Sequence, residues 1–246
     1  MLTNPDLHAR LQDGARAMGL ALSDEAVHTM LAYGARVLEV NQNLNLTRIV
    51  EPEAFIDRHL LDSLSLLACH EANTWLPVGA SLADIGTGAG FPGIPLAIAR
   101  PDTRVFLFDA LRKKIEFVRE TCASLGIVAE YAHGRAEDFG ILPEHRECYD
   151  LVVSRAVANS ALLCDWSLPF AKRGGTVVFY KGPGVETELS AAQTASKALG
   201  GGLPVRLPAP LPRDDLQHEF IVIPKLHHTP ASFPRKPAQV QKKPWT

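Results

Sequence analysis

The stretch that decides the fold is Asp84-Ile85-Gly86-Thr87-Gly88-Ala89-Gly90-Phe91-Pro92-Gly93, which lies between a short apolar run and a helix-like segment. Glycines in such a turn allow the backbone to bend tightly and to come close to a ligand. The dinucleotide-binding fingerprint G-x-G-x-x-G requires its third glycine at position 91, where this chain has Phe91. The turn therefore indicates a ligand-binding loop after a strand, with a spacing that departs from the dinucleotide pattern.

Two acids and a third segment support a cofactor site around this turn. The G-x-G-x-G spacing resembles the S-adenosylmethionine loop of the class I methyltransferases, and Asp84, two residues before the first glycine, fits that pattern. Asp109 is expected to end the next strand, where an acid commonly accepts hydrogen bonds from ribose hydroxyls. The segment Arg135-Ala136-Glu137-Asp138 can hold an adenine edge. Two alternatives stay open, namely a turn that serves only packing, with Asp109 capping a helix, and a nicotinamide-binding enzyme.

From residue 81 onward, short apolar runs alternate with amphipathic segments. The expected strands are Leu82–Ile85, Arg104–Phe108, Val128–Ala132, Tyr149–Ser154, Thr176–Tyr180, Pro204–Leu207 and Glu219–Ile223, and the expected helices are Ile94–Ala99, Arg112–Leu125, Arg135–Phe139, Ser160–Ala171 and Glu186–Ala198. Repeated strand–helix–strand units indicate a parallel, doubly wound sheet. The last two strands are joined by residues 208–217, which leave no room for a helix, so we expect an antiparallel hairpin there.

The pattern thus predicts an α/β protein with a Rossmann-like, seven-stranded, mostly parallel sheet whose last strand is antiparallel. Residues 1–75 read as an N-terminal helical extension packed on the core, because apolar residues after Ser23 and again from His59 recur at three- and four-residue steps. Residues 76–224 form the expected cofactor-binding domain. Residues 225–246 contain four prolines and form an expected extended, basic tail.

Charge and composition limit the possible partners. The chain of 246 residues carries a net charge of −2, but residues 225–246 hold five Lys/Arg and no acid, which leaves −7 for the rest. Such asymmetry is compatible with a polyanion partner. The N-terminus lacks the pattern of a signal peptide, and no apolar run approaches the ~18–20 residues that span a bilayer, so we expect a cytoplasmic protein without a membrane partner. The four cysteines have no paired spacing, so we expect no metal site and four small, buried side chains.

The loop after the fourth expected strand bears on the reaction. It reads Ser154-Arg155-Ala156, without the Asn/Asp-Pro-Pro-aromatic motif of amine methylation or the Pro-Cys pair of covalent pyrimidine chemistry. A nucleophile that already has a lone pair, such as guanine N7, needs no base. Arg155 and Lys181, at the ends of strands four and five, can then hold phosphate or the guanine edge. The alternatives are a surface ion pair and a strand-end lysine.

Several motifs together resemble one known family over about residues 20–245. These are Asn45-Leu46-Thr47, Arg58-His59-Leu60-Leu61-Asp62-Ser63, the run Asp84–Pro95, Ser154-Arg155-Ala156, Lys181-Gly182 and Phe233-Pro234-Arg235-Lys236. They resemble the RsmG (GidB) family of bacterial 16S rRNA methyltransferases. That resemblance implies methylation at N7 of the guanine at nucleotide 527, in the 530 loop, with S-adenosyl-L-methionine as cofactor. In the tail, Ala238 and Val240 depart from the family pattern.

The resemblance also implies residue roles. The catalytic set around the target base is Asn45, His59, Arg155 and Lys181, although His59 alone is as often structural and Asn45 can equally cap a turn. Loop and resemblance together give a cofactor-binding set of Asp84, Gly86, Gly88, Phe91, Asp109, Ala136, Glu137 and Arg155.

The expected partner is 16S rRNA or the 30S subunit, bound by a monomer that does not act on DNA. Two other functions remain open at this point. One is a methyltransferase of a small metabolite, and the other is a non-catalytic RNA-binding assembly protein with a vestigial cofactor pocket.

Overall fold

The computed structural model describes residues 2, 4–155, 158–213 and 216–246, and its centre is a seven-stranded sheet of order β3-β2-β1-β4-β5-β7-β6. Strands β1 to β5 run parallel, and β7 is antiparallel to both of its neighbours, as expected. The strands are β1 Ser81–Ile85, β2 Arg104–Asp109, β3 Glu130–His133, β4 Tyr149–Arg155, β5 Ala171–Lys181, β6 Val205–Pro208 and β7 Glu219–Pro224. The prediction for the third strand was two residues early, because Val128 is exposed and outside the ladder.

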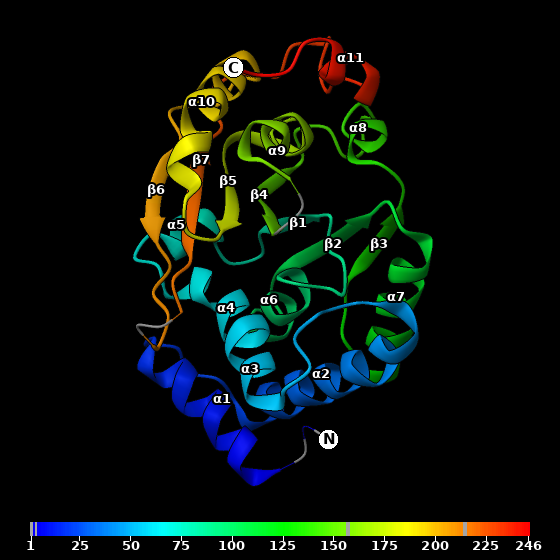
Figure 1. The fold of residues 1–246 in the computed structure, drawn as a ribbon, viewed down its shortest axis with the longest axis vertical. Helices are drawn as coiled ribbons and strands as arrows, with labels where there is room; N and C mark the ends of the chain where they lie inside the picture. Colours follow the sequence, from blue (N-terminus) through cyan, green and yellow to red (C-terminus); the bar gives the residue numbers. More distant parts are fainter. Residues whose placement is uncertain (1, 3, 156–157, 214–215) are drawn as a thin grey trace.

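Helices cover both faces of this sheet, which explains why the central strands β1 and β4 are buried along most of their length rather than on alternate residues (Figure 1). One face carries α6 (Gly93–Ala99), α7 (Arg112–Leu125) and the N-terminal helices, while the other carries α8 (Ala136–Phe139), α9 (Ser160–Ser167) and α10 (Leu189–Ala198), which follows the 3-10 turn η3 (Val185–Glu188). Leu82 faces the first layer and Ala83 the second. The fourth predicted helix was too long, because β5 already begins at Ala171.

The N-terminal extension shares its core with the sheet rather than forming a separate one. Leu31, Phe55 and Leu64 belong to the same buried cluster as Leu82 and Leu107. The elements are α1 Pro5–Ala17, α2 Asp24–Leu44, α3 Pro52–Phe55, the π-helix η1 Ile56–Leu61, α4 Asp62–Leu64, the 3-10 turn η2 Ser65–Ala68 and α5 Ala72–Trp75. The π-helix was not predicted, and such wide turns often occur at functional sites.

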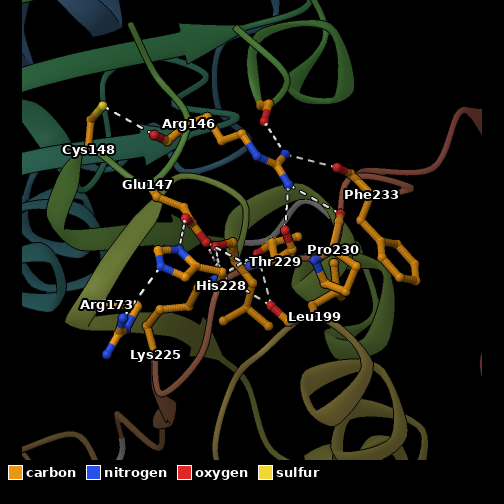
Figure 2. Close-up of polar contacts among 12 residues, drawn as sticks. Arg146, Glu147, Cys148, Arg173, Leu199, Lys225, His228, Thr229, Pro230 and Phe233 are labelled. Atoms are coloured by element: carbon orange, nitrogen blue, oxygen red, sulfur yellow. Dashed lines mark hydrogen bonds and ion pairs between the residues drawn. The ribbon is translucent and has the colours of Figure 1, made fainter. Parts of the chain in front are cut away.

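The C-terminal segment is attached to the body by polar contacts of Arg146 and of the buried Lys225 (Figure 2). The Arg146 guanidinium donates to the backbone carbonyls of Gly140, Phe233, Thr229 and Pro230 at 2.7–3.2 Å. Lys225 is buried, and its Nζ donates to the Leu168 and Leu199 carbonyls and to the Thr229 hydroxyl. Burial lowers the pKa of Lys225 to about 8.

The expectation of an extended basic tail needs correction. Its last part forms a short helix, α11 (Pro237–Lys242), and Arg235 makes a buried ion pair with Asp165 on α9 at 2.6 Å. Two of the five tail cations, Lys225 and Arg235, therefore serve the fold, and the exposed tail cations are Lys236, Lys242 and Lys243.

The expectation of four buried cysteines was also wrong, because Cys148 is exposed. Within the described part of the chain, no helix is long and apolar enough to cross a membrane.

Candidate active site

A cavity of about 720 Å³ lies at the carboxyl ends of the parallel strands, where ligands bind in doubly wound sheets. One wall of the cavity is formed by the segments that follow β1, β2 and β3 and by the ends of β4 and β5. The π-helix and His218, just before β7, face them. The lining residues include Arg58, His59, Asp62, Gly86, Gly88, Phe91, Asp109, Ala136, Glu137, Arg155, Tyr180, Lys181 and His218.

The conformation of the glycine-rich loop depends on its own glycines and on a contact with the N-terminal extension. Gly86, Gly88 and Gly90 all have positive φ, between 60° and 88°, a region in which other residues are strained. A side chain at Gly90 would also collide with Tyr33 of α2, whose hydroxyl donates to the Ala89 carbonyl at 2.6 Å. The N-terminal extension thus holds the loop in place.

Asp84 lies beneath this loop rather than at the cavity wall, which revises its expected role as a cofactor contact. It is fully buried and does not line the cavity, and its Oδ2 accepts hydrogen bonds from the Thr87 hydroxyl and the Gly93 amide at 2.7 and 2.9 Å. Burial raises the pKa of Asp84 to about 6, although these two hydrogen bonds act in the opposite direction. Asp84 therefore fixes the shape of the loop.

Asp109 and Glu137 stand at the wall where sequence reasoning placed them. The Asp109 carboxylate accepts from the Gly88 and Leu111 amides, each at 2.8 Å, which ties the loop to the end of β2. The Oε1 atom of Glu137 is buried and has no hydrogen-bond partner among the described residues, and the Arg135 guanidinium lies 3.8 Å away. A buried acceptor without a donor is costly, so Glu137 fits a ligand that brings an N–H or O–H group.

The opposite end of the cavity contains a linked polar cluster around Arg155. Its guanidinium donates to the Asp62 carboxylate at 2.8 Å and approaches the Nδ1 atom of His59 at 3.0 Å. The Nδ1 atom of His218 lies 2.6 Å from the other oxygen of Asp62. Burial would raise the pKa of Asp62, but the hydrogen bonds and charges of His218 and Arg155 lower it overall. Asp62 is therefore an ionised, buried carboxylate.

The imidazole ring of His59 is held in place by stacking on an aromatic ring. Its ring stacks on Phe91 with centroids 4.9 Å apart and planes 10° apart, and the Arg155 guanidinium lies over the same Phe91 ring at 5.3 Å. Burial, with the positive charge of Arg155, lowers the pKa of His59 to about 3. The imidazole is consequently neutral at physiological pH.

The other expected site residues are placed less centrally. Lys181 lines the cavity but forms an ion pair with Glu188 at 2.8 Å and donates to the Ala158 carbonyl. Asn45 is exposed and ends α2 in a left-handed conformation, the turn-capping alternative, and it does not line the cavity. Ala156, part of the quoted loop motif, lies outside the described residues.

Sequence reasoning missed Asp62 and His218 as members of the cluster. Asp62 lies within the quoted Arg58–Ser63 motif, so its proximity to His59 was a usable signal. His218 had no such signal, because it is 156 residues away along the chain and reaches Asp62 only through the antiparallel placement of β7.

Comparison with known proteins agrees with this architecture. The family model GidB, described as rRNA small subunit methyltransferase G, matches residues 26–204. The chain belongs to the GidB family. This confirms the family that the motifs of the sequence resembled.

Curated relatives of this GidB chain match it almost from end to end. A ribosomal RNA small subunit methyltransferase G of Alkaliphilus oremlandii (strain OhILAs) is 41% identical over 236 residues, which cover 95% of this chain and 97% of the relative. The protein of the same name from Pelotomaculum thermopropionicum (strain DSM 13744 / JCM 10971 / SI) is 42% identical over 235 residues with the same coverage. Among solved structures, the (4+2)-cyclase SpnF superposes with a TM-score of 0.50 at 12% identity, over 70% of this chain and 81% of that one. That likeness concerns the fold alone.

Proposed function

We propose that the protein transfers a methyl group from S-adenosyl-L-methionine to N7 of a guanine in 16S rRNA, with nucleotide 527 of the 530 loop as the target implied by the family. One observation carries the choice of N7. Arg155 donates to both Asp62 and His59, and the pKa of each is lowered, so neither group is suited to take a proton from a substrate. This favours a nucleophile that has its own lone pair, as guanine N7 does.

The cofactor half of the proposal rests on the loop, Asp109 and Glu137. When bound, S-adenosylmethionine supplies a sulfonium methyl group. The positive-φ glycines allow the backbone to come close to such a ligand, and Asp109 keeps unused lone pairs for ribose hydroxyls. The Oε1 atom of Glu137, which has no hydrogen-bond donor among the described residues, would accept from an N–H or O–H donor on the ligand.

The transfer half rests on Arg155. A guanidinium has five N–H donors, and three of them serve the Asp62 carboxylate, the His59 ring and the Arg58 carbonyl. Two donors remain for a carboxylate or for the O6 edge of guanine. With no proton to remove, such positioning is the main way in which these residues promote the reaction.

A second candidate function is favoured by the Asp62–His218 pair. A carboxylate 2.6 Å from an imidazole is an arrangement that supports a general base, which methylation of a hydroxyl on a small metabolite would use. Under that alternative, His218→Gln should reduce turnover by about 100-fold or more. Transfer to N7 requires no base, so the same variant should lose far less.

The deciding experiment measures incorporation of a labelled methyl group into 16S rRNA, 30S subunits and 70S ribosomes. The modified nucleotide is then mapped by borohydride reduction and aniline cleavage, which reports N7-methylguanine. The proposal expects label and one cleavage site in the 530 loop. Absence of label from every RNA substrate would overturn it, and S-adenosylmethionine binding without RNA methylation would point to a small-molecule substrate.

A further inference from the structure

The cations that sequence reasoning assigned to RNA contact are largely engaged within the protein. Arg155 is paired with Asp62, Lys181 with Glu188 and Arg235 with Asp165, all within 2.8 Å. Phosphate contacts dominate the affinity of proteins for nucleic acids, and they require available cations. If the protein acts on rRNA, other side chains must supply them.

A second hollow of about 470 Å³ adjoins the active-site cavity and is strongly basic. The end of α2, the start of α7 and the end of β3 enclose it, and it shares Ala110, Leu111 and Lys114 with the cavity. Its lining residues are Asn43, Leu44, Ala110, Leu111, Arg112, Lys113, Lys114 and His133, which we call the basic groove. It contains no acidic side chain.

The lysines of the basic groove have no charged or hydrogen-bonded partner among the residues that the structure describes. Arg112 pairs with Glu116, but Lys113 and Lys114 make no ion pair or side-chain hydrogen bond within the described part of the chain. Three consecutive cations in the first turn of α7, which has no acid there, also oppose the helix dipole. Packing and helix stability therefore do not account for this charge, whereas a polyanion beside the active site does.

We propose that the basic groove binds the RNA backbone next to the target nucleotide, an inference that rests on the proposed function. A base that reacts inside a cavity must leave the stack, so its flanking phosphates have to lie at the cavity rim. The groove meets the cavity at Leu111 and Lys114, so a strand lying along it would deliver a base into the cavity. Lys113 and Lys114 then contact phosphates, and Asn43 offers polar contacts to the sugar edge.

The test uses Lys113→Glu, because Lys113 lines the groove and not the cavity. The matched control is Arg119→Glu, an exposed cation on the same helix that lies outside the groove and makes no ion pair or side-chain hydrogen bond with the residues that the structure describes. We expect the KM for 16S rRNA or 30S subunits to rise about tenfold in Lys113→Glu and less than about twofold in the control, with kcat and S-adenosylmethionine affinity unchanged in both. An acid at this position suits the start of a helix, so the melting temperature should not fall, which separates lost binding from misfolding.

Salt dependence gives a second measurement. Lys113→Gln should reduce the slope of log affinity for RNA against log salt by about 0.7, the value for one phosphate contact on a single strand. If the KM and the salt slope of RNA binding are unchanged in both Lys113 variants, the inference is overturned. Methylation of RNA by the wild-type protein would in that case still support the proposed function. Binding of inorganic phosphate that depends on Lys113, without any change in RNA affinity, would assign the groove to a free anion and also overturn it. If the wild-type protein neither binds nor methylates RNA, both proposals fail.

Discussion

The Arg155 guanidinium donates a hydrogen bond to the Nδ1 atom of His59 across 3.0 Å, which fixes the tautomer of that histidine. Arginine has no acceptor, so Nδ1 must be the unprotonated nitrogen. The Nε2 atom therefore has the proton and donates to the Thr47 hydroxyl at 2.7 Å. The end of β4 is thus joined to the π-helix and to the loop after α2 by one chain of hydrogen bonds.

His59 should remain neutral well below the usual pKa of histidine. Because the folded pKa is about 3 against 6.5, the unfolded chain binds a proton between these values that the folded protein does not bind. The free energy of unfolding should consequently fall by up to about 1.4 kcal/mol per pH unit as the pH drops below 6.5. The free energy of unfolding of wild type and of His59→Gln is measured by urea unfolding between pH 7 and pH 5. The difference between the two proteins isolates the contribution of His59, because the other titratable groups contribute equally to both. Nitrogen NMR shifts should show the Nε2–H tautomer throughout, and a ring that titrates near 6.5 would contradict this.

Replacement of Arg155 should affect stability as well as activity. Arg155→Ala leaves the buried Asp62 carboxylate with His218 alone and removes the donor to His59, at a cost of about 3–5 kcal/mol. Arg155→Lys keeps the positive charge but cannot reproduce the three directed hydrogen bonds, so we expect a folded protein whose kcat falls about 100-fold. Methyl transfer and thermal melting are measured in parallel. Near-normal kcat in Arg155→Lys would move the positioning role to another residue.

Most of the architecture followed from the sequence because strand ends can be located without side-chain geometry. In a parallel sheet the carboxyl ends of the strands meet at one edge, so Asp109, Glu137, Arg155 and Lys181 were expected to surround one cavity, and they do. The sequence did not show which of the expected site residues would line the cavity and which would lie behind its wall and support the loop. Asp84 fits the loop motif, yet the turn at Gly93 places it underneath the loop.

Pairings between distant segments were the part that the sequence did not reveal. Lys225 and Arg235 were counted as free tail charges. In the structure, Lys225 donates to a buried backbone carbonyl and forms an ion pair with Glu147, and Arg235 forms an ion pair with Asp165. The formal charge of a segment says nothing about which charges remain available after folding. Conversely, Lys113 and Lys114 were not singled out in the sequence, yet they make no ion pair or side-chain hydrogen bond with the described residues and so remain available.

Loss of Arg235 should release the C-terminal segment. Asp165 is fully buried, and its carboxylate accepts from the Arg235 side chain and from the Trp245 indole at 2.6–3.0 Å. Arg235→Ala should therefore lower the free energy of unfolding by about 3 kcal/mol and make residues after 230 sensitive to limited proteolysis. The control replaces the exposed Lys236, Lys242 and Lys243 by Gln, which should change stability by less than about 0.5 kcal/mol. Equal stability of both variants would show that the ion pair does not hold the segment.

Asp84→Asn should change how stability depends on pH. The pKa of Asp84 is about 6 in the folded protein against 3.8 for an aspartate in water, so the unfolded chain loses its proton first as the pH rises. Ionisation of this one group therefore lowers the free energy of unfolding by about 2.4 kcal/mol between pH 4 and pH 7. Asparagine can still accept from the Thr87 hydroxyl and the Gly93 amide but has no proton to lose. The stability of Asp84→Asn minus that of wild type, measured by urea unfolding in matched buffers, should thus increase by about 2.4 kcal/mol from pH 4 to pH 7. A difference that stays constant with pH would mean that Asp84 is ionised in the folded protein as readily as in the unfolded chain.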